Sequence, residues 1–143
     1  MTVIFSKKCE LALQAVLFLS IKRDDFIFNA KEISDELKVP KEFVSKMLQT
    51  LTDSGIVGSK KGKNGGFFLA RQPSDIKLIE IVEAIDGLAV FKSCVLGFPN
   101  CGTDHPCPVH DKWGKIRDEA YNMLCDETLE QLKEKTTKKI ISL

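Results

Sequence analysis

The segment that most constrains the fold is IVGSKKGKNGGFFLA (56–70), a glycine- and lysine-rich stretch with apolar ends. Asn64-Gly65 is a favoured two-residue turn, so the segment predicts a two-stranded β-hairpin with a basic tip. Two short helical patterns precede it, NAKEISDELKV (29–39) and the stretch that follows Pro40. The order helix, helix, basic hairpin predicts a winged helix-turn-helix.

The two helical patterns carry further local signals. Asn29 and Glu32 are spaced to form a capping box at the start of the first helix. In the second helix, apolar residues recur at the spacing of a half-buried helix. These residues are Phe43, Val44, Met47, Leu48 and Leu51. The opposite face carries the polar residues Glu42, Ser45, Lys46 and Gln49.

Charge is unevenly distributed along the chain. The whole chain carries +1, but residues 38–71 contain seven basic and two acidic side chains, a net +5, so the remainder carries −4. A local basic excess of this kind is typical of an anion-binding surface. A helix can read base edges in the major groove while a lysine-rich ribbon contacts phosphates or the minor groove.

The predicted partner is therefore double-stranded DNA. The residues expected to contact it are Lys41, Glu42, Ser45, Lys46, Gln49, Lys60, Lys61, Lys63 and Asn64. A solvated helix face and a soluble basic loop can have the same composition, but the order of the elements favours DNA binding. Each lysine that neutralises a phosphate is expected to steepen the salt dependence by about −0.9 in log-log slope.

The other helical patterns complete a mainly α fold with a small β-hairpin. Residues 8–22 predict a largely buried first helix, and residues 26–28 a short strand. A further helix is expected to start with Ser74 or Asp75 as its cap and to end at Gly87. Its expected apolar face consists of Leu78, Ile81, Val82 and Ile85.

Composition and the N-terminal stretch indicate a soluble cytoplasmic protein. The apolar and charged fractions, 43% and 29%, are near the averages of globular proteins. The apolar run at 11–21 is too short to span a bilayer and lacks a small-residue cleavage site. In the reducing cytoplasm, clustered cysteines bind metals or perform redox chemistry more often than they form permanent disulfides.

Three of the five cysteines lie in one loop, KSCVLGFPNCGTDHPCPVHDKW (92–113). Cys94, Cys101 and Cys107 are separated by six and five residues, and two residues separate the last from His110. Thiolates select zinc, copper(I) or iron-sulfur clusters. Structural zinc sites usually contain C-x₂₋₄-C pairs, which this loop lacks, so the long intervals favour an iron-sulfur cluster.

Two other uses of the loop stay open, namely zinc binding and reversible oxidation of a reactive thiol. A thiol redox enzyme has no support, because the chain lacks a CxxC pair and KGKNGG lacks the strand-to-helix context of a phosphate-binding loop. We therefore expect that the protein is not an enzyme. Cys9 and Cys125 lie in apolar helical contexts and are expected to pack as small hydrophobes. His105 is expected to be solvated.

The predicted organisation has three parts. They are a winged helix-turn-helix DNA-binding domain (1–87), a cysteine-rich cluster-binding loop (88–109), and a dimerisation helix with a C-terminal tail (110–143). The last part shows helical apolar spacing at Trp113, Ile116, Ala120 and Met123. Because this stripe lies outside the N-terminal unit, we expect it to pair with a second copy of the chain.

These motifs resemble those of the winged helix-turn-helix iron-sulfur regulators that include IscR, NsrR and CymR. The resemblance spans nearly the whole chain and rests on SKKCELAL, LTDSGIV, KKGKNGGFFLA, IKLIEIVEAIDG and CVLGFPNCGTDHPCPVHDKW. The cysteine loop with HDxW is the most specific of these. The resemblance implies a homodimeric transcription factor, crossed through its C-terminal helices, that senses iron-sulfur status, nitric oxide or redox state and acts as a repressor.

The resemblance also implies a cofactor. In similar proteins the cysteine loop holds a 2Fe-2S or 4Fe-4S cluster, and the fourth ligand is a histidine, His110 here, or an acidic residue donated by the partner subunit, Glu10 here. This chain departs from the assembly regulator in two ways. Six residues, where five are usual, separate its first two cysteines, and its reading helix carries Lys41, Glu42 and Ser45 in place of the expected set. The operator and the signal therefore stay open.

Overall fold

The computed structural model describes residues 4–22, 27–99 and 101–141, with side chains as far as Thr136. In chain order its elements are α1 (Lys7–Ile21), α2 (Ala30–Leu37), α3 (Lys41–Asp53), β1 (Val57–Lys60), β2 (Gly66–Leu69), α4 (Leu78–Asp86), α5 (His110–Asp126) and α6 (Leu129–Ile141). Short 3₁₀ turns lie at Pro73–Asp75 and Ala89–Phe91. This arrangement confirms the predicted mainly α fold with a small β-hairpin.

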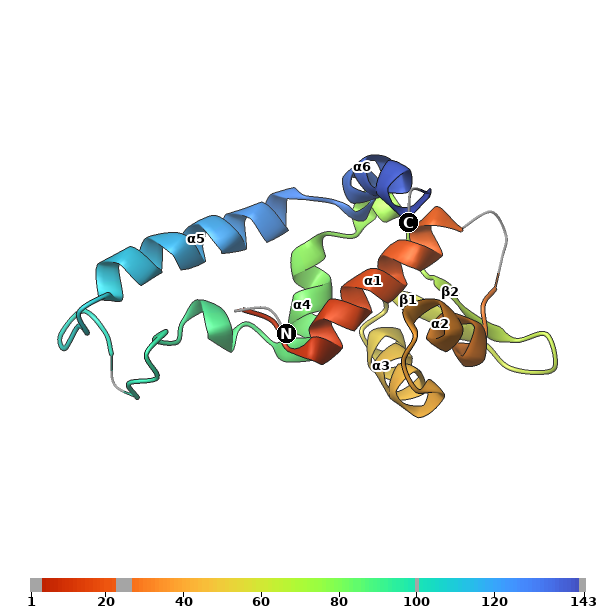
Figure 1. The fold of residues 1–143 in the computed structure, drawn as a ribbon, viewed down its shortest axis with the longest axis horizontal. Coiled ribbons are helices and arrows are strands. Elements are labelled where there is room, and N and C mark those ends of the chain that lie inside the picture. The colour runs from red at the N-terminus through yellow and green to blue at the C-terminus, as the bar shows by residue number, and fades with distance from the viewer. Residues whose placement is uncertain (1–3, 23–26, 100, 142–143) are drawn as a thin grey trace.

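One helix extends as an arm from a body formed by the others (Figure 1). The body contains α1, α2, α3, α4 and α6, with the β1-β2 hairpin at its edge. α5 points away from this body, and the segment 92–109, which we call the cysteine loop, lies at the far end of α5. The hairpin and the cysteine loop therefore lie at opposite ends of the molecule.

α1 lies at the centre of the body because apolar residues cover most of its circumference. Its buried residues are Cys9, Leu11, Ala12, Ala15, Val16, Leu19 and Ser20. They share one core with apolar side chains of the surrounding helices, among them Ile33, Val44, Met47, Leu48, Leu51, Ile81, Val82, Leu124 and Leu129. The predicted burial of the first helix is confirmed.

α2 and α3 form the helix-turn-helix. The predicted capping box is present, since the Glu32 N–H donates to Asn29 Oδ1 at 2.8 Å and the Asn29 N–H donates to Glu32 Oε1 at 3.3 Å. Lys38 ends α2 in the left-handed conformation, with φ 57°. Pro40 directly precedes α3, where its missing N–H removes no helical hydrogen bond. The connection is thus confined to residues 38–40.

β1 and β2 pair in antiparallel register, and the last pair joins Lys60 to Gly66. The predicted two-residue turn at Asn64-Gly65 is wrong, because residues 61–65 connect the strands. Gly65 closes a turn, since its N–H donates to the Gly62 carbonyl at 3.0 Å, and it lies against the backbone of Lys60. A Cβ at this position would lie 2.0 Å from the Lys60 carbonyl oxygen, so the close approach requires glycine.

Phe28 adds a single bridge to β2. Its N–H donates to the Phe67 carbonyl at 3.1 Å, and the Phe67 N–H donates back to the Phe28 carbonyl at 2.7 Å. The predicted strand at 26–28 is therefore reduced to one bridged residue, and Phe26 itself lies outside the described residues.

α4 begins later in the chain than predicted. The expected caps, Ser74 and Asp75, lie in a 3₁₀ turn, and the helix starts at Leu78. The intervening residues are extended because they pair with the connection between α5 and α6. In this pairing the Leu129 N–H donates to the Ile76 carbonyl at 2.8 Å. A distant segment, rather than a local cap, thus sets the start of α4.

α6 is a helix that the sequence pattern did not indicate. It turns back from the end of α5 and packs on α1 (Figure 1). Its first residue, Leu129, is fully buried in the common core, and Leu132 packs against that core. The C-terminal part 110–143 therefore contains both the arm and a helix of the body. Among the described helices, none has the length and apolar content needed to cross a membrane.

Candidate metal centre and DNA interface

The cysteine loop brings Cys94, Cys101 and Cys107 together beside the first turn of α5. Their three Sγ atoms lie within 4.8 Å of one another, and those of Cys94 and Cys107 are 3.5 Å apart. All three thiols are free and partly exposed. Two sulfur ligands of one tetrahedral metal ion are about 3.8 Å apart, given metal-sulfur bonds of about 2.3 Å. The spacing of the sulfurs therefore fits a common metal centre.

The two predicted fourth ligands lie in different places. His110 is the first residue of α5, and its Nδ1 atom lies 3.3 Å from Cys101 Sγ. Glu10 lies in the first turn of α1, 3.5 Å from the Lys7 ammonium, and is not part of the three-sulfur group of its own chain. Within one chain the geometry favours His110, whereas Glu10 would have to come from a second chain.

The cysteines of the site differ in their pKa. Desolvation raises the pKa of Cys94, but the backbone N–H groups of Phe98 and Leu96 and the neighbouring thiols outweigh it and lower the pKa to about 7. Desolvation and the two other sulfurs raise the pKa of Cys107. The thiolate, which is the form that binds metals and attacks electrophiles, is therefore more accessible at neutral pH at Cys94 than at Cys107.

α5 holds the cysteine loop through side chains whose roles the sequence pattern did not reveal. The Trp113 Nε1–H donates to the Ser93 carbonyl at 2.9 Å, and Arg117 Nη1 donates to the same oxygen at 3.1 Å. The pattern placed Trp113 in an apolar stripe and in the HDxW motif, without a contact partner. The sequence signal that could have indicated these contacts is the i, i+3, i+7 spacing of His110, Trp113 and Arg117, which puts all three on one helical face.

The surroundings of the sulfurs suit a negatively charged group. A cavity of about 360 Å³ is lined by residues that include Cys94, Cys101, His110 and Arg117. Arg117 Nε is buried and has no hydrogen-bond partner among the described atoms. A buried donor without an acceptor is costly, and a metal-thiolate centre carries the charge that would satisfy it. Thiolates with an imidazole suit an iron-sulfur cluster and also zinc.

The other cysteines and His105 lie outside the three-sulfur group. Cys9 is fully buried, and desolvation, followed by the nearby Asp86 carboxylate, raises its pKa to about 12. The predicted packing role is confirmed for Cys9, whereas Cys125 on α5 is only partly covered. His105 is exposed in the cysteine loop, in agreement with the predicted solvated histidine.

The predicted reading face of α3 points away from the body. Its exposed residues are Lys41, Glu42, Lys46 and Gln49, and Ser45 is half-buried. The opposite face of α3 is buried in the core. Gln49 Nε2 donates to Asp53 Oδ1, four residues later on the same helix, at 3.1 Å.

The hairpin forms a cationic tip. Its exposed polar residues are Lys60, Lys61, Lys63 and Asn64. The tip extends beyond the body on the side where α2 and α3 lie (Figure 1). The α3 helix and the basic tip are thus both remote from the cysteine loop (Figure 1).

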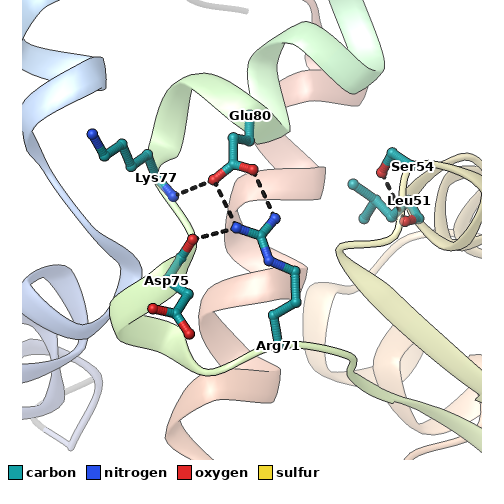
Figure 2. Close-up of polar contacts among 6 residues, drawn as sticks. All are labelled: Leu51, Ser54, Arg71, Asp75, Lys77 and Glu80. Carbon is teal, nitrogen blue, oxygen red and sulfur yellow. Dashed lines mark hydrogen bonds and ion pairs between the residues drawn. The ribbon is translucent and has the colours of Figure 1, made fainter.

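An ion pair fastens the end of the hairpin to α4. Arg71 Nη1 lies 2.7 Å from Glu80 Oε1, and Arg71 also donates to the Asp75 carbonyl (Figure 2). The Lys77 N–H donates to the other Glu80 oxygen at 2.8 Å. Burial raises the pKa of Glu80, but Arg71 and Lys77 outweigh this effect and lower the pKa. The positive charge of Arg71 is therefore paired with Glu80 within the fold.

Comparison with known proteins adds an independent finding. Residues 5–135 match the Rrf2 family, described as iron-dependent transcriptional regulators. An Aquifex aeolicus protein assigned as an HTH-type transcriptional regulator is 32% identical over 131 residues, which cover 90% of each chain. The transcriptional regulator NsrR of Oceanobacillus iheyensis is 27% identical, over 88% of this chain and 86% of that protein.

A solved structure shares the fold. CymR, the global cysteine regulator of B. subtilis, superposes with a TM-score of 0.76 over 92% of this chain and 97% of that chain, at 23% identity. At this identity the likeness concerns the fold, which is a winged helix-turn-helix with a C-terminal arm.

Proposed function

Because the chain belongs to the Rrf2 family of iron-dependent transcriptional regulators, we propose that it is a cytoplasmic repressor whose affinity for its operator depends on an iron-sulfur cluster. The observation that carries this proposal is the convergence of the Cys94, Cys101 and Cys107 sulfurs within 4.8 Å at the end of the arm. In this proposal the regulator responds to iron-sulfur status, nitric oxide or redox state.

The cluster is held by the three thiolates and by His110 or Glu10 of the partner subunit. The 3.3 Å distance between His110 Nδ1 and Cys101 Sγ supports the histidine. When bound, a cluster with a non-thiolate ligand supplies an iron atom that oxidants and nitric oxide can reach. The backbone also positions one of the sulfurs, because the Cys107 N–H donates to Cys101 Sγ at 3.4 Å.

DNA is bound by α3 and the hairpin. The side chains proposed for the major groove are Lys41, Glu42, Ser45, Lys46 and Gln49. Glutamine suits adenine, lysine suits guanine, and glutamate can accept from cytosine, so this set can read base edges. Lys60, Lys61, Lys63 and Asn64 are proposed to contact phosphates or the minor groove.

A second copy of the chain is proposed to cover the exposed side of α5. Ile116 and Met123, which lie seven residues apart on one face of the helix, are 53% and 54% exposed. Such apolar exposure on one helix is typical of an interaction surface. A homodimer places two reading helices on half-sites about 34 Å apart, and it offers a route by which Glu10 of the partner subunit can approach the cysteine loop.

The second candidate is a regulator that uses zinc or reversible thiol oxidation at the same cysteines. It is favoured by the 3.5 Å separation of the Cys94 and Cys107 sulfurs, which a small movement can close into a bond, and by the lowered pKa of Cys94. Metal analysis separates the candidates, because zinc and a disulfide are colourless and contain no sulfide.

Selection of duplexes from a random-sequence DNA pool tests the function. The selected sequence is then titrated with protein prepared anaerobically with iron and sulfide, and with metal-depleted protein. We expect different affinities for the two forms. Cys101→Ser, which removes one ligand, should behave like the depleted form, and Cys125→Ser like the wild type. Failure to select any sequence, or equal affinities of all these preparations, would contradict the proposal.

A further inference from the structure

One face of α5 contacts the cysteine loop at two separate points. His110 Nδ1 lies 3.3 Å from Cys101 Sγ. Trp113 Nε1 and Arg117 Nη1 donate to the Ser93 carbonyl at 2.9 and 3.1 Å. Because residues at i, i+3 and i+7 share a helical face, one side of α5 makes all of these contacts. It contacts Cys101 directly and holds Cys94 through the carbonyl of the preceding residue, Ser93.

Contacts to the Ser93 carbonyl restrict the position of Cys94, because Ser93 directly precedes Cys94 in the chain. A carbonyl oxygen has two acceptor lone pairs, and Trp113 and Arg117 use both. The Ser93 hydroxyl in turn donates to the Ala89 carbonyl at 2.8 Å. The backbone that carries the first sulfur is thus fixed to α5 on one side and to the preceding 3₁₀ turn on the other.

The Arg117 guanidinium has a further hydrogen-bond donor besides the one that contacts Ser93. Its Nη1 is used by Ser93, but its Nε is buried and has no partner among the described atoms. Arg117 lines the same cavity as Cys94 and Cys101, and the other cationic residue in that lining is Lys92. None of the described residues that line this cavity is acidic. The thiolates are therefore the anionic groups on hand to balance the guanidinium.

We propose that Trp113 and Arg117 are positioning residues for the sulfur site. Both hold Cys94 in place through the Ser93 carbonyl, and Arg117 in addition offsets the negative charge of the metal-bound thiolates. This inference rests on the proposed function, because it requires that the three sulfurs bind a metal centre. A purely structural role would stabilise the loop without changing the electronic properties of the centre.

The variants separate these contributions. Trp113→Phe removes the Nε1 donor and keeps an aromatic ring. Arg117→Lys keeps the charge but loses the planar fork, and Arg117→Met loses both. Lys115→Met is the matched control, because Lys115 is an exposed cation on the same helix. Circular dichroism of each variant checks that the helices are retained.

The first measurement is the affinity for cobalt(II). The reduced, metal-free protein is titrated with cobalt(II), and binding is monitored by the thiolate-to-cobalt charge-transfer absorption. Loss of an outer-shell partner typically lowers metal affinity by about 10- to 100-fold. We expect a loss of this size for Arg117→Met and for Trp113→Phe, a smaller loss for Arg117→Lys, and wild-type affinity for Lys115→Met.

The reduction potential of the reconstituted iron-sulfur centre is the second readout. Arg117→Met should make the potential more negative, since a nearby positive charge favours the added electron, while Arg117→Lys should stay closer to the wild type. If Arg117→Met matches Lys115→Met in both affinity and potential while the wild type binds cobalt, this inference alone is overturned. A wild-type protein that binds neither cobalt nor iron overturns the proposed function as well.

Discussion

The Arg71 guanidinium lies 2.7 Å from the Glu80 carboxylate, so an ion pair joins the end of the hairpin to the first turn of α4 (Figure 2). Arg71 is two residues beyond the end of β2, at Leu69. α4 also contacts α1, α3 and α5. The pair therefore links the basic hairpin to a helix that contacts both the body and the arm.

Replacing Glu80 by Gln should lower the free energy of unfolding by about 1 kcal/mol or less at pH 7, since partly exposed ion pairs contribute about 0–1 kcal/mol. The folded-state pKa of Glu80 is lowered, so its contribution is present at neutral pH. It is lost as the pH falls through that pKa, below the ordinary value of about 4.3.

Urea unfolding at pH 7 and pH 3 measures this effect. Glu83→Gln is the control, because Glu83 is exposed on the same helix. A deficit of Glu80→Gln that is as large at pH 3 as at pH 7 would show that the carboxylate charge is not its cause.

Neutralising the tip of the hairpin should flatten the salt dependence of DNA binding. Lys61→Ala and Lys63→Ala should each reduce the log-log slope of affinity against salt by about 0.9, if each lysine contacts one phosphate. Fluorescence anisotropy with a selected duplex measures the slope. Lys115→Ala, on the arm, should leave it unchanged. If Lys61→Ala and Lys63→Ala keep the wild-type slope, the phosphate contacts lie outside the tip of the hairpin.

α6 should be essential for the stability of the body. Leu129 is fully buried, so Leu129→Ala should lower the free energy of unfolding by about 2–5 kcal/mol through lost burial and a residual cavity. Glu134→Ala, at an exposed position of the same helix, should change it by less than about 0.5 kcal/mol. Chemical denaturation compares the two, and similar small effects would mean that α6 docks only loosely.

The thiols should differ in reactivity in the metal-free, reduced protein. Cys94 should be alkylated faster than Cys107 at pH 7 and reach half of its maximal rate at a pH of about 7, since its pKa is lowered to about 7. Cys107 should need a higher pH. Cys9 should stay unmodified while the protein is folded, because it is buried and its pKa is raised to about 12. Peptide mass spectrometry gives the order, and early labelling of Cys9 would contradict it.

Local signals were sufficient for the parts of the fold that local contacts build. The Asn29 and Glu32 side chains cap α2 as their spacing predicts, and the periodic apolar residues of α3 are buried apart from Phe43, which is partly buried. Local signals were misleading where distant segments take over. Ser74 and Asp75 are good caps, but pairing of Ile76 with the α5-α6 connection keeps the chain extended there.

The candidate site shows the same division. The three cysteines could be grouped from their spacing in one short loop, because any metal centre must draw such ligands together. The role of Arg117 could not, since its partner Ser93 lies 24 residues earlier and a surface arginine is common on any helix. Similarly, the charge of Arg71 counts toward the basic segment in the sequence, whereas the fold directs it to Glu80.

The most direct test of the account is the anaerobic absorption spectrum of the reconstituted protein, with iron, sulfide and zinc determined per chain. We expect a brown protein that contains iron and acid-labile sulfide, loss of colour and bound iron in Cys101→Ser, and their retention in Cys125→Ser. A colourless wild-type protein without iron, or Cys101→Ser that keeps its full colour and iron, would contradict the account.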